Sequence, residues 1–185
     1  MRSRRIVGGL IALITSLGLV AVSTAPAQAE SRQRTGYTQV VVAPAVYDLV
    51  AGAGITPKAV GGAKAFAYKG TLAARFPITG ISLRKLKIRH TGGISLEAGS
   101  AKITLRKLTI DLRRLKVTGK VKGSIGNVGR VNLFTIRRSD RPGLGLVQLR
   151  LTATAAGALN STFGVEAFSA GDTFGYATPR PFGRF

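Results

Sequence analysis

The sequence predicts a mainly β domain, either an antiparallel β-sandwich or an open barrel, with one or two short helices. Short runs of alternating apolar residues recur along most of the chain, and β-branched residues are frequent in them. Glycine-containing turn signals separate these runs at short intervals. The chain has no cysteine, so packing rather than disulfide bonds must stabilise the domain.

The first 29 residues resemble a secretory signal peptide, because the basic start MRSRR precedes an apolar run at 6–22 and a small-residue AQA site. An uncleaved membrane anchor is the alternative, although glycines within the run disfavour it. The start also resembles a twin-arginine signal, so the general and twin-arginine export routes both stay open. We expect a secreted protein, extracellular or associated with the cell envelope. After the signal peptide (1–29) we expect a flexible segment (30–36), a single β-rich domain (37–178) and a loose C-terminal tail (179–185).

The expected elements have recognisable boundaries. TQVVVA at 38–43 predicts the first strand, and PAVYDLVAG at 44–52 predicts a short helix with proline in its first turn and glycine at its end. The glycine- and alanine-rich stretch 55–65 is expected to be an irregular connector before a strand at 66–78. The later pattern predicts, in order, a turn at 139–143, a strand at 146–154, a short helix at 155–163 and a closing strand at 172–178.

An internal repeat occupies the middle of the chain. ISLRKLKI at 81–88 recurs as ITLRKLTI at 103–110, and LRRLKV at 112–117 is a partial third copy. Leucines of the second and third copies have helical spacing, but the β-branched residues and flanking glycines favour strands. The apolar alternation of each full copy slips by one residue at its Arg-Lys pair, which predicts a β-bulge there. The two full copies are therefore expected to be equivalent strands of a meander.

Positive charge dominates the composition. The chain has 28 lysines and arginines against 7 acidic residues, a net charge of +21. Removing the first 29 residues, which contain three arginines and no acidic residue, leaves +18 on 156 residues. Such a field attracts anionic partners, and we expect anionic cell-wall polymers or a membrane surface.

Many of these cations cluster in the repeat region and are expected to share one face. The ordinary alternative is a solvated outer face whose lysine and arginine stems cover the core. No aromatic residue is interleaved with the cations there, so sequence-specific nucleic-acid binding is not expected. The residues expected to bind anions are Arg84, Lys85, Lys87, Arg89, Arg106, Lys107, Arg113 and Arg114.

The sequence offers little material for catalysis. It has one histidine, seven scattered carboxylates, no GxSxG motif and no cluster with metal-ligand spacing. We therefore expect no catalytic residues, no metal site and no enzymatic activity. A weaker alternative is a wall-glycan hydrolase that uses Glu97 and Asp111 as its carboxylate pair.

One region resembles a known family. From Phe66 to Val121, including the histidine-glycine turn IRHTGGISL at 88–96, the chain is similar to secreted actinobacterial β-rich proteins and to the HtaA domain of haem uptake. The resemblance implies a secreted, non-enzymatic binding protein of the cell envelope. Its implied partner is haem or a haem-carrying protein.

The resemblance also implies which residues contact haem. His90 corresponds to the turn histidine, and Tyr47 is the best counterpart of the family's tyrosine. The other tyrosines, Tyr37, Tyr68 and Tyr176, stay open as alternatives. The rival function is a structural or adhesive wall-associated protein that attaches to anionic polymers through its basic face.

Overall fold

The computed structural model describes residues 36–185, so the expected signal peptide and nearly all of the flexible segment lie outside the described residues. The described part is mainly β, with two helices. The elements in chain order are β1 (Tyr37–Val42), α1 (Pro44–Gly52), β2 (Thr56–Val60), β3 (Lys64–Tyr68), β4 (Thr71–Ser82), β5 (Lys87–His90), β6 (Gly93–Ala98), β7 (Ala101–Asp111), β8 (Lys116–Gly123), β9 (Gly126–Arg138), β10 (Val147–Leu151), α2 (Ala153–Phe163) and β11 (Thr173–Arg180).

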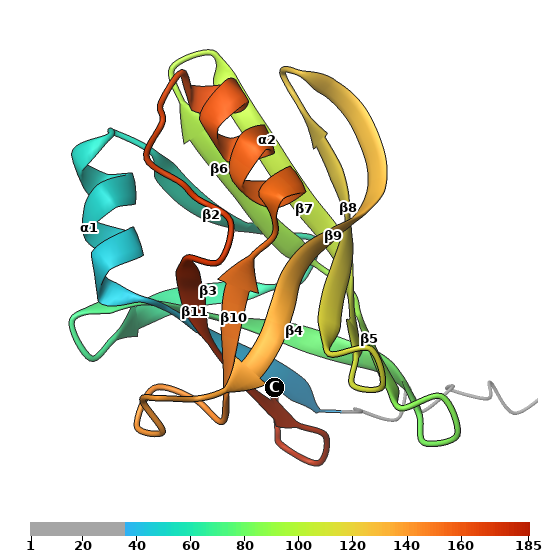
Figure 1. The fold of residues 1–185 in the computed structure, drawn as a ribbon. Helices are drawn as coiled ribbons and strands as arrows, with labels where there is room; N and C mark the ends of the chain where they lie inside the picture. Colours follow the sequence, from blue (N-terminus) through green and yellow to red (C-terminus); the bar gives the residue numbers. More distant parts are fainter. Residues whose placement is uncertain (1–35) are drawn as a thin grey trace, which may run out of the picture. The chain divides into compact units, whose positions relative to one another are not determined.

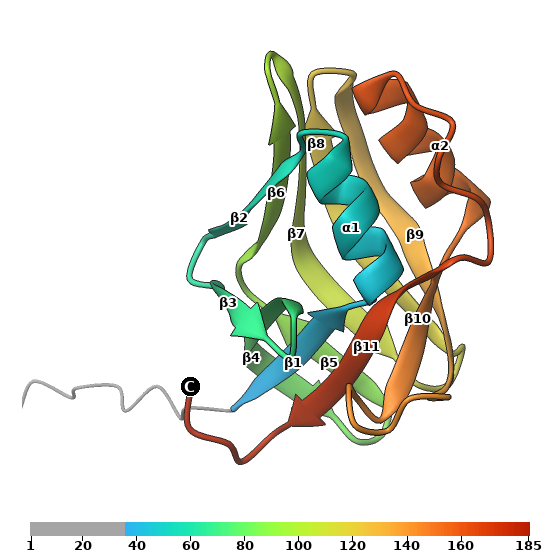
Figure 2. The same ribbon diagram turned by 90° about the vertical axis from the view of Figure 1, so that its left-hand side faces the viewer.

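Eight of the strands form a closed antiparallel barrel (Figures 1 and 2). Their order is β7-β5-β4-β1-β11-β10-β9-β8, and β8 pairs back onto β7 to close the ring. Of the two predicted architectures, the sandwich is wrong and the barrel is right. The barrel is closed rather than open because the long strand β7 has a partner along both of its edges.

Two long strands of the barrel also carry the remaining three strands. One edge of β4 pairs with β3 in its first half and with β5 in its second half. One edge of β7 likewise pairs with β6 and then with β5, and β2 extends β6 as an edge strand. The prediction of an irregular connector at 55–65 is therefore wrong. Pro57 obscured β2 in the sequence, since proline lacks an N–H and is tolerated mainly in edge strands.

Both helices were predicted, and the bounds of α1 are confirmed. Pro44 starts α1, whose buried residues Val46 and Val50 face the barrel interior. Figure 2 shows α1 lying between β2 and β11, across one end of the barrel. α2 begins at a Thr152 cap that accepts a hydrogen bond from the Ala155 N–H, and it packs against β7 and β9. Within residues 36–185, neither helix is long and apolar enough to cross a membrane.

The repeat does not form equivalent strands, so that prediction is wrong. In the first copy the Arg-Lys pair lies in a tight turn between β4 and β5. In the second copy it lies within β7, where the pairing with β8 shifts register between Arg106 and Thr109. The predicted bulge is thus confirmed in the second copy and wrong in the first. The partial third copy forms the β7–β8 turn and resembles the first copy in structure.

The end of the chain is more ordered than a loose tail. β11 continues to Arg180, and Gly183 donates its N–H to the Arg180 carbonyl. The ring of Phe185 contacts the ring of Tyr37 edge-on, with the ammonium of Lys64 4.7 Å from the Phe185 ring centre. Aromatic and cation–π contacts therefore hold the last residues against the outer wall.

Candidate ligand-binding pocket

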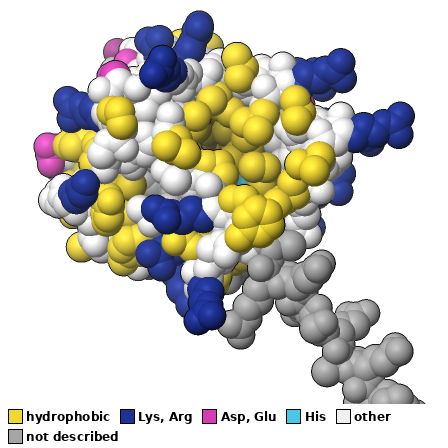
Figure 3. Space-filling model, turned by 90° about the horizontal axis from the view of Figure 1, so that it is seen from below, with side chains coloured by type: hydrophobic (Ala, Val, Ile, Leu, Met, Phe, Trp, Pro, Cys, Tyr) yellow, Lys and Arg dark blue, Asp and Glu magenta, His cyan; other side chains and the backbone are white. Residues whose placement is uncertain are grey.

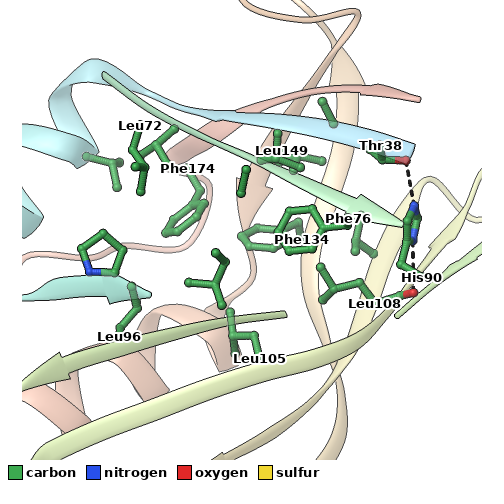
Figure 4. Close-up of a pocket in the computed structure, with 18 of the residues that line it drawn as sticks. Thr38, Leu72, Phe76, His90, Leu96, Leu105, Leu108, Phe134, Leu149 and Phe174 are labelled. Carbon is green, nitrogen blue, oxygen red and sulfur yellow. Dashed lines mark hydrogen bonds between the residues drawn. The ribbon is translucent and has the colours of Figure 1, made fainter. Parts of the chain in front are cut away.

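The barrel encloses an apolar pocket of about 100 Å³. All of its neighbouring elements contribute inward-facing side chains, including α1 and nearly every strand. Thr38, Tyr47 and His90 are the polar residues among an otherwise apolar lining. Figure 4 shows His90 at one end of the pocket, between Thr38 and Leu108. The apolar lining comprises Val40, Val42, Val46, Val50, Pro57, Leu72, Ala74, Phe76, Ile94, Leu96, Leu105, Leu108, Ile110, Val117, Phe134, Leu149, Phe174 and Ala177.

The bulge in β7 explains the position of His90. Lys107 and Leu108 together stand opposite the single residue Gly119, so their carbonyls leave the regular ladder. Arg130 donates to the Lys107 carbonyl, at 2.9 Å. His90 Nδ1 lies 3.2 Å from the Leu108 carbonyl. Two side chains therefore satisfy the two carbonyls that the bulge releases.

The contacts of His90 determine its protonation. A carbonyl only accepts hydrogen bonds, so Nδ1 carries the proton and Nε2 is the unprotonated nitrogen. Nε2 accepts from the Thr38 hydroxyl at 2.7 Å. Burial lowers the pKa of His90 from 6.5 to about 4, although the bond to Leu108 acts in the opposite direction. At neutral pH the pocket therefore contains an uncharged imidazole.

Tyr47 shares this pocket with His90, whereas the other tyrosines do not line it. The Tyr47 side chain is half-buried on α1, and within residues 36–185 its hydroxyl makes no hydrogen bond. Tyr37 and Tyr68 take part in aromatic contacts away from the pocket. Tyr176 is buried opposite Val41 on the next strand, and burial raises the pKa of its hydroxyl. Among the tyrosines, only Tyr47 is therefore placed to meet a ligand in the pocket.

The expected anion-binding residues lie on β5, β7 and the two turns at the ends of these strands. In the ladder Arg106 stands opposite Lys120, which stands opposite Arg130. Asp111 lies 3.4 Å from Lys87 and 3.9 Å from Arg114. Burial alone would raise the pKa of Asp111, but the Arg114 N–H and Lys87 lower it overall. This outer wall thus carries mainly positive charge, with Asp111 held as a carboxylate among cations.

The two carboxylates proposed for glycan hydrolysis lie far apart. Glu97 stands opposite Lys102 at the start of β7, whereas Asp111 is the last residue of β7. Nine residues of extended chain span roughly 30 Å, well beyond the separation of about 5–9.5 Å in glycosidases. Lys102, Lys58 and Ser95 also lower the pKa of Glu97 to about 2, which makes it unsuitable as a general acid.

Other catalytic arrangements also lack support in the part of the chain that the structure describes. His90 contacts a threonine hydroxyl and a backbone carbonyl instead of a serine and a carboxylate. Within residues 36–185 no group of three or more histidine, aspartate or glutamate side chains converges on a metal site.

His90 and Tyr47, the two residues predicted to contact a cofactor, both line this pocket, but the sequence did not reveal Thr38 or the carbonyl of Leu108 as partners of His90. Thr38 lies 52 residues from His90, and nothing in the local pattern TQVVVA marks its hydroxyl as a partner of histidine. The slipped alternation at Arg106 and Lys107 was the one available signal for the bulge.

The fold and the pocket together are those of a small closed β-barrel with an internal cavity. An eight-stranded closed barrel has an interior that side chains can fill or that can hold one small ligand. Here the interior is apolar and retains a cavity with an uncharged imidazole at one end.

Two solved structures match this fold, both from Corynebacterium glutamicum. The haem-binding protein HtaB has a TM-score of 0.57 at 12% identity, over 77% of this chain and 90% of that chain. The C-terminal domain of HtaA has a TM-score of 0.51 at 11% identity, over 77% of this chain and 94% of that chain. No family model and no curated protein sequence matches the chain. The HtaA-like fold implied by the sequence resemblance is thus confirmed, and at these identities the likeness concerns the fold alone.

Proposed function

We propose that this protein binds an apolar small molecule inside its barrel and that haem is this ligand. The observation that carries the proposal is one apolar pocket that brings together His90 and Tyr47. The similar fold of the haem-binding protein HtaB supports it. The proposed binding protein is non-enzymatic, secreted and associated with the cell envelope.

His90 and Tyr47 belong to residue types that ligate haem iron. Histidines that bind metals commonly donate their second ring N–H to a backbone carbonyl, as His90 does to Leu108. Nε2 would then be the ligand atom once the Thr38 hydroxyl turns away from it. The Tyr47 hydroxyl has no competing partner within the described residues, and a phenolate is a second known axial ligand type. Bound haem would supply an iron centre and two propionates.

The surroundings of the pocket also suit haem. Figure 3 shows a hollow among hydrophobic side chains, with lysine and arginine side chains around this apolar area. The apolar lining excludes water from the macrocycle, and cations near its margin can pair with propionates. The described cavity of about 100 Å³ is small beside typical cofactor pockets of roughly 300–1,000 Å³. Haem binding therefore requires the cavity to widen. Of the elements that line the cavity, α1 is the one that belongs to no strand ladder.

A titration with hemin and with iron-free protoporphyrin tests this proposal. Ala74→Phe places a ring in the cavity and should abolish binding of both compounds. Tyr47→Phe and His90→Gln should alter the hemin Soret band while leaving protoporphyrin affinity within about twofold. The matched control is Tyr68→Phe, which removes a hydroxyl from the outer wall, and thermal melts verify that each variant folds. Undiminished hemin binding by a folded Ala74→Phe protein would place the site elsewhere and refute the proposal.

The basic outer wall supports a second function, attachment to anionic wall polymers. The row Arg106, Lys120 and Arg130 supports it, because these three cations are neighbours on adjacent strands. Retention on an immobilised polyanion should fall steeply between 50 and 500 mM salt, whereas hemin ligation should not. Retention that salt leaves unchanged would exclude this electrostatic function.

A further inference from the structure

Two turns with nearly the same sequence lie side by side at one edge of the barrel. They are Leu83–Leu86, with sequence LRKL, and Leu112–Leu115, with sequence LRRL, and we call them the paired leucine turns. The Leu112 N–H donates to the Leu86 carbonyl at 2.9 Å, which joins them directly. Figure 1 shows both at its lower right, with the β4–β5 turn projecting furthest.

The leucines of these turns are exposed to solvent. Leu83 is 81% exposed, Leu86 47% and Leu115 53%. Leu112 and the adjacent Ile81 are also exposed hydrophobic residues. Single exposed leucines are common on proteins, but four exposed leucines on two joined turns, with Ile81 of β4 next to them in sequence, suggest an interaction surface.

At two of these positions the backbone conformation is unfavourable for leucine. Leu86 has φ +48° and Leu115 has φ +50°, in the left-handed region that favours glycine and asparagine. A leucine in this region is strained, and Leu86 and Leu115 are only about half buried. Leucine nevertheless occupies this strained position in both turns. Strain that recurs at two half-exposed positions, where asparagine or glycine would relieve it, suggests a functional reason for the residue.

Basic residues stand between the leucines of each turn. Arg84 and Lys85 occupy the centre of the first turn, and Arg113 and Arg114 occupy the centre of the second. Of these four residues, only Arg114 forms an ion pair within residues 36–185, with Asp111 at 3.9 Å. Exposed leucines flanked by cations are the combination that binds anionic bilayers, since the leucines enter the acyl boundary while the cations meet phosphates.

We infer that the paired leucine turns dock this protein onto an anionic lipid surface. The leucines insert, and the two Arg-containing pairs select membranes with negative headgroups. This docking surface does not depend on the contents of the barrel pocket, because the two sets of residues share no member.

Vesicle sedimentation tests the inference with the chain from Glu30 to Phe185, which omits the apolar run at 6–22. Residues 36–185 all belong to one compact unit, and circular dichroism with a thermal melt verifies folding. The probes are vesicles of phosphatidylcholine alone and of phosphatidylcholine with 30% phosphatidylglycerol. Leu86→Asn with Leu115→Asn removes both leucines without backbone strain, and Leu146→Asn is the control on another exposed leucine.

A second pair of variants tests the charges. Arg84→Gln with Lys85→Gln removes two charges from the turn, and Lys120→Gln with Lys122→Gln removes two from the wall. We expect binding to the anionic vesicles only. The Leu86/Leu115 and Arg84/Lys85 variants should each lose about tenfold or more in affinity, and the two controls less than about threefold.

Three results would overturn the inference. Equal binding to neutral vesicles would remove the role of charge. An unchanged affinity of the Leu86/Leu115 variant would exclude insertion. Equal losses for Arg84/Lys85 and Lys120/Lys122, together with equally tight binding to soluble polyphosphate, would instead identify the whole basic wall as a polyanion-binding surface.

Discussion

The Thr38 hydroxyl and the Nε2 atom of His90 lie 2.7 Å apart in the interior of the barrel, on strands that are not neighbours in the sheet. β4 lies between them, and the other nitrogen of His90 reaches the bulge of β7. One imidazole therefore connects three strands that are far apart in sequence. Its two hydrogen bonds explain a buried neutral histidine even without a ligand, because both ring nitrogens have partners.

Thr38→Val should destabilise the protein by about 1–3 kcal/mol, because it leaves the buried Nε2 without a donor at nearly constant side-chain volume. Chemical denaturation at pH 7 measures the change in the free energy of unfolding. Thr79→Val is the matched control, since the Thr79 hydroxyl bonds the Arg89 carbonyl at an exposed position. Equal losses of stability in both variants would show that the buried Thr38–His90 hydrogen bond contributes no more than an exposed one.

The stability of the protein should fall as the pH decreases from about 6.5 to about 4. The folded protein holds the pKa of His90 at about 4, so in this range the unfolded chain binds a proton that the folded chain does not. The loss should reach about 3 kcal/mol at the acid end. Urea titrations at several pH values measure it.

Two variants separate this effect from other titrations. His90→Gln should flatten the dependence between pH 6.5 and 4.5. The carboxyl of Glu97, whose folded pKa is about 2, contributes only below about pH 4.5. A slope that persists in the His90→Gln protein would assign the titration to another group.

Gly93→Ala should be strongly destabilising, by about 3 kcal/mol or more. A Cβ at this position would lie 1.9 Å from the Leu105 carbonyl oxygen, so β6 could not keep its pairing with β7. Gly80→Ala, on β4, is the control because a Cβ there meets nothing within 4 Å. Thermal melts of both variants compare them, and similar melting temperatures would contradict the close strand approach.

Leu115→Asn should raise the free energy of unfolding by up to about 1 kcal/mol, because asparagine tolerates the positive φ better than leucine does. Leu112→Asn changes the same side chain at a position without positive φ, and it should not stabilise the protein. Denaturation curves of the two variants measure the change in the free energy of unfolding. A destabilised Leu115→Asn protein would show that this leucine has a packing role that outweighs its strain.

Much of the local structure was predictable because its causes are local. Proline at the first position and glycine at the end delimit α1 within a few residues. The slipped alternation at Arg106 and Lys107 predicted the bulge in β7 for the same reason. β2 was missed because a short edge strand gains most of its stability from a distant partner, Gly93–Ala98 here. β3 was merged with β4 into one expected strand at 66–78, although a two-residue turn separates them.

The repeat shows most clearly that local sequence alone does not determine the backbone conformation. Leu83–Leu86 and Leu105–Leu108 have the same sequence, LRKL, yet positive φ occurs at Leu86 in the first and at Lys107 in the second. The first tetrapeptide reverses the chain between β4 and β5, and the second continues β7 along β8. Identical residues adopt two conformations because the strands that flank them differ, and no local propensity can separate the two cases.

By itself the sequence determined the mainly β class, the first helix, the net charge and the two residues of interest, His90 and Tyr47. These depend on composition, on periodicity and on a short resemblance. Only the tertiary structure decided that β8 closes the barrel onto β7, that Thr38 and Leu108 hold the imidazole, and that Tyr47 lines the same pocket. The physical reason is that each of these features joins residues distant in sequence, whose approach depends on the whole strand order.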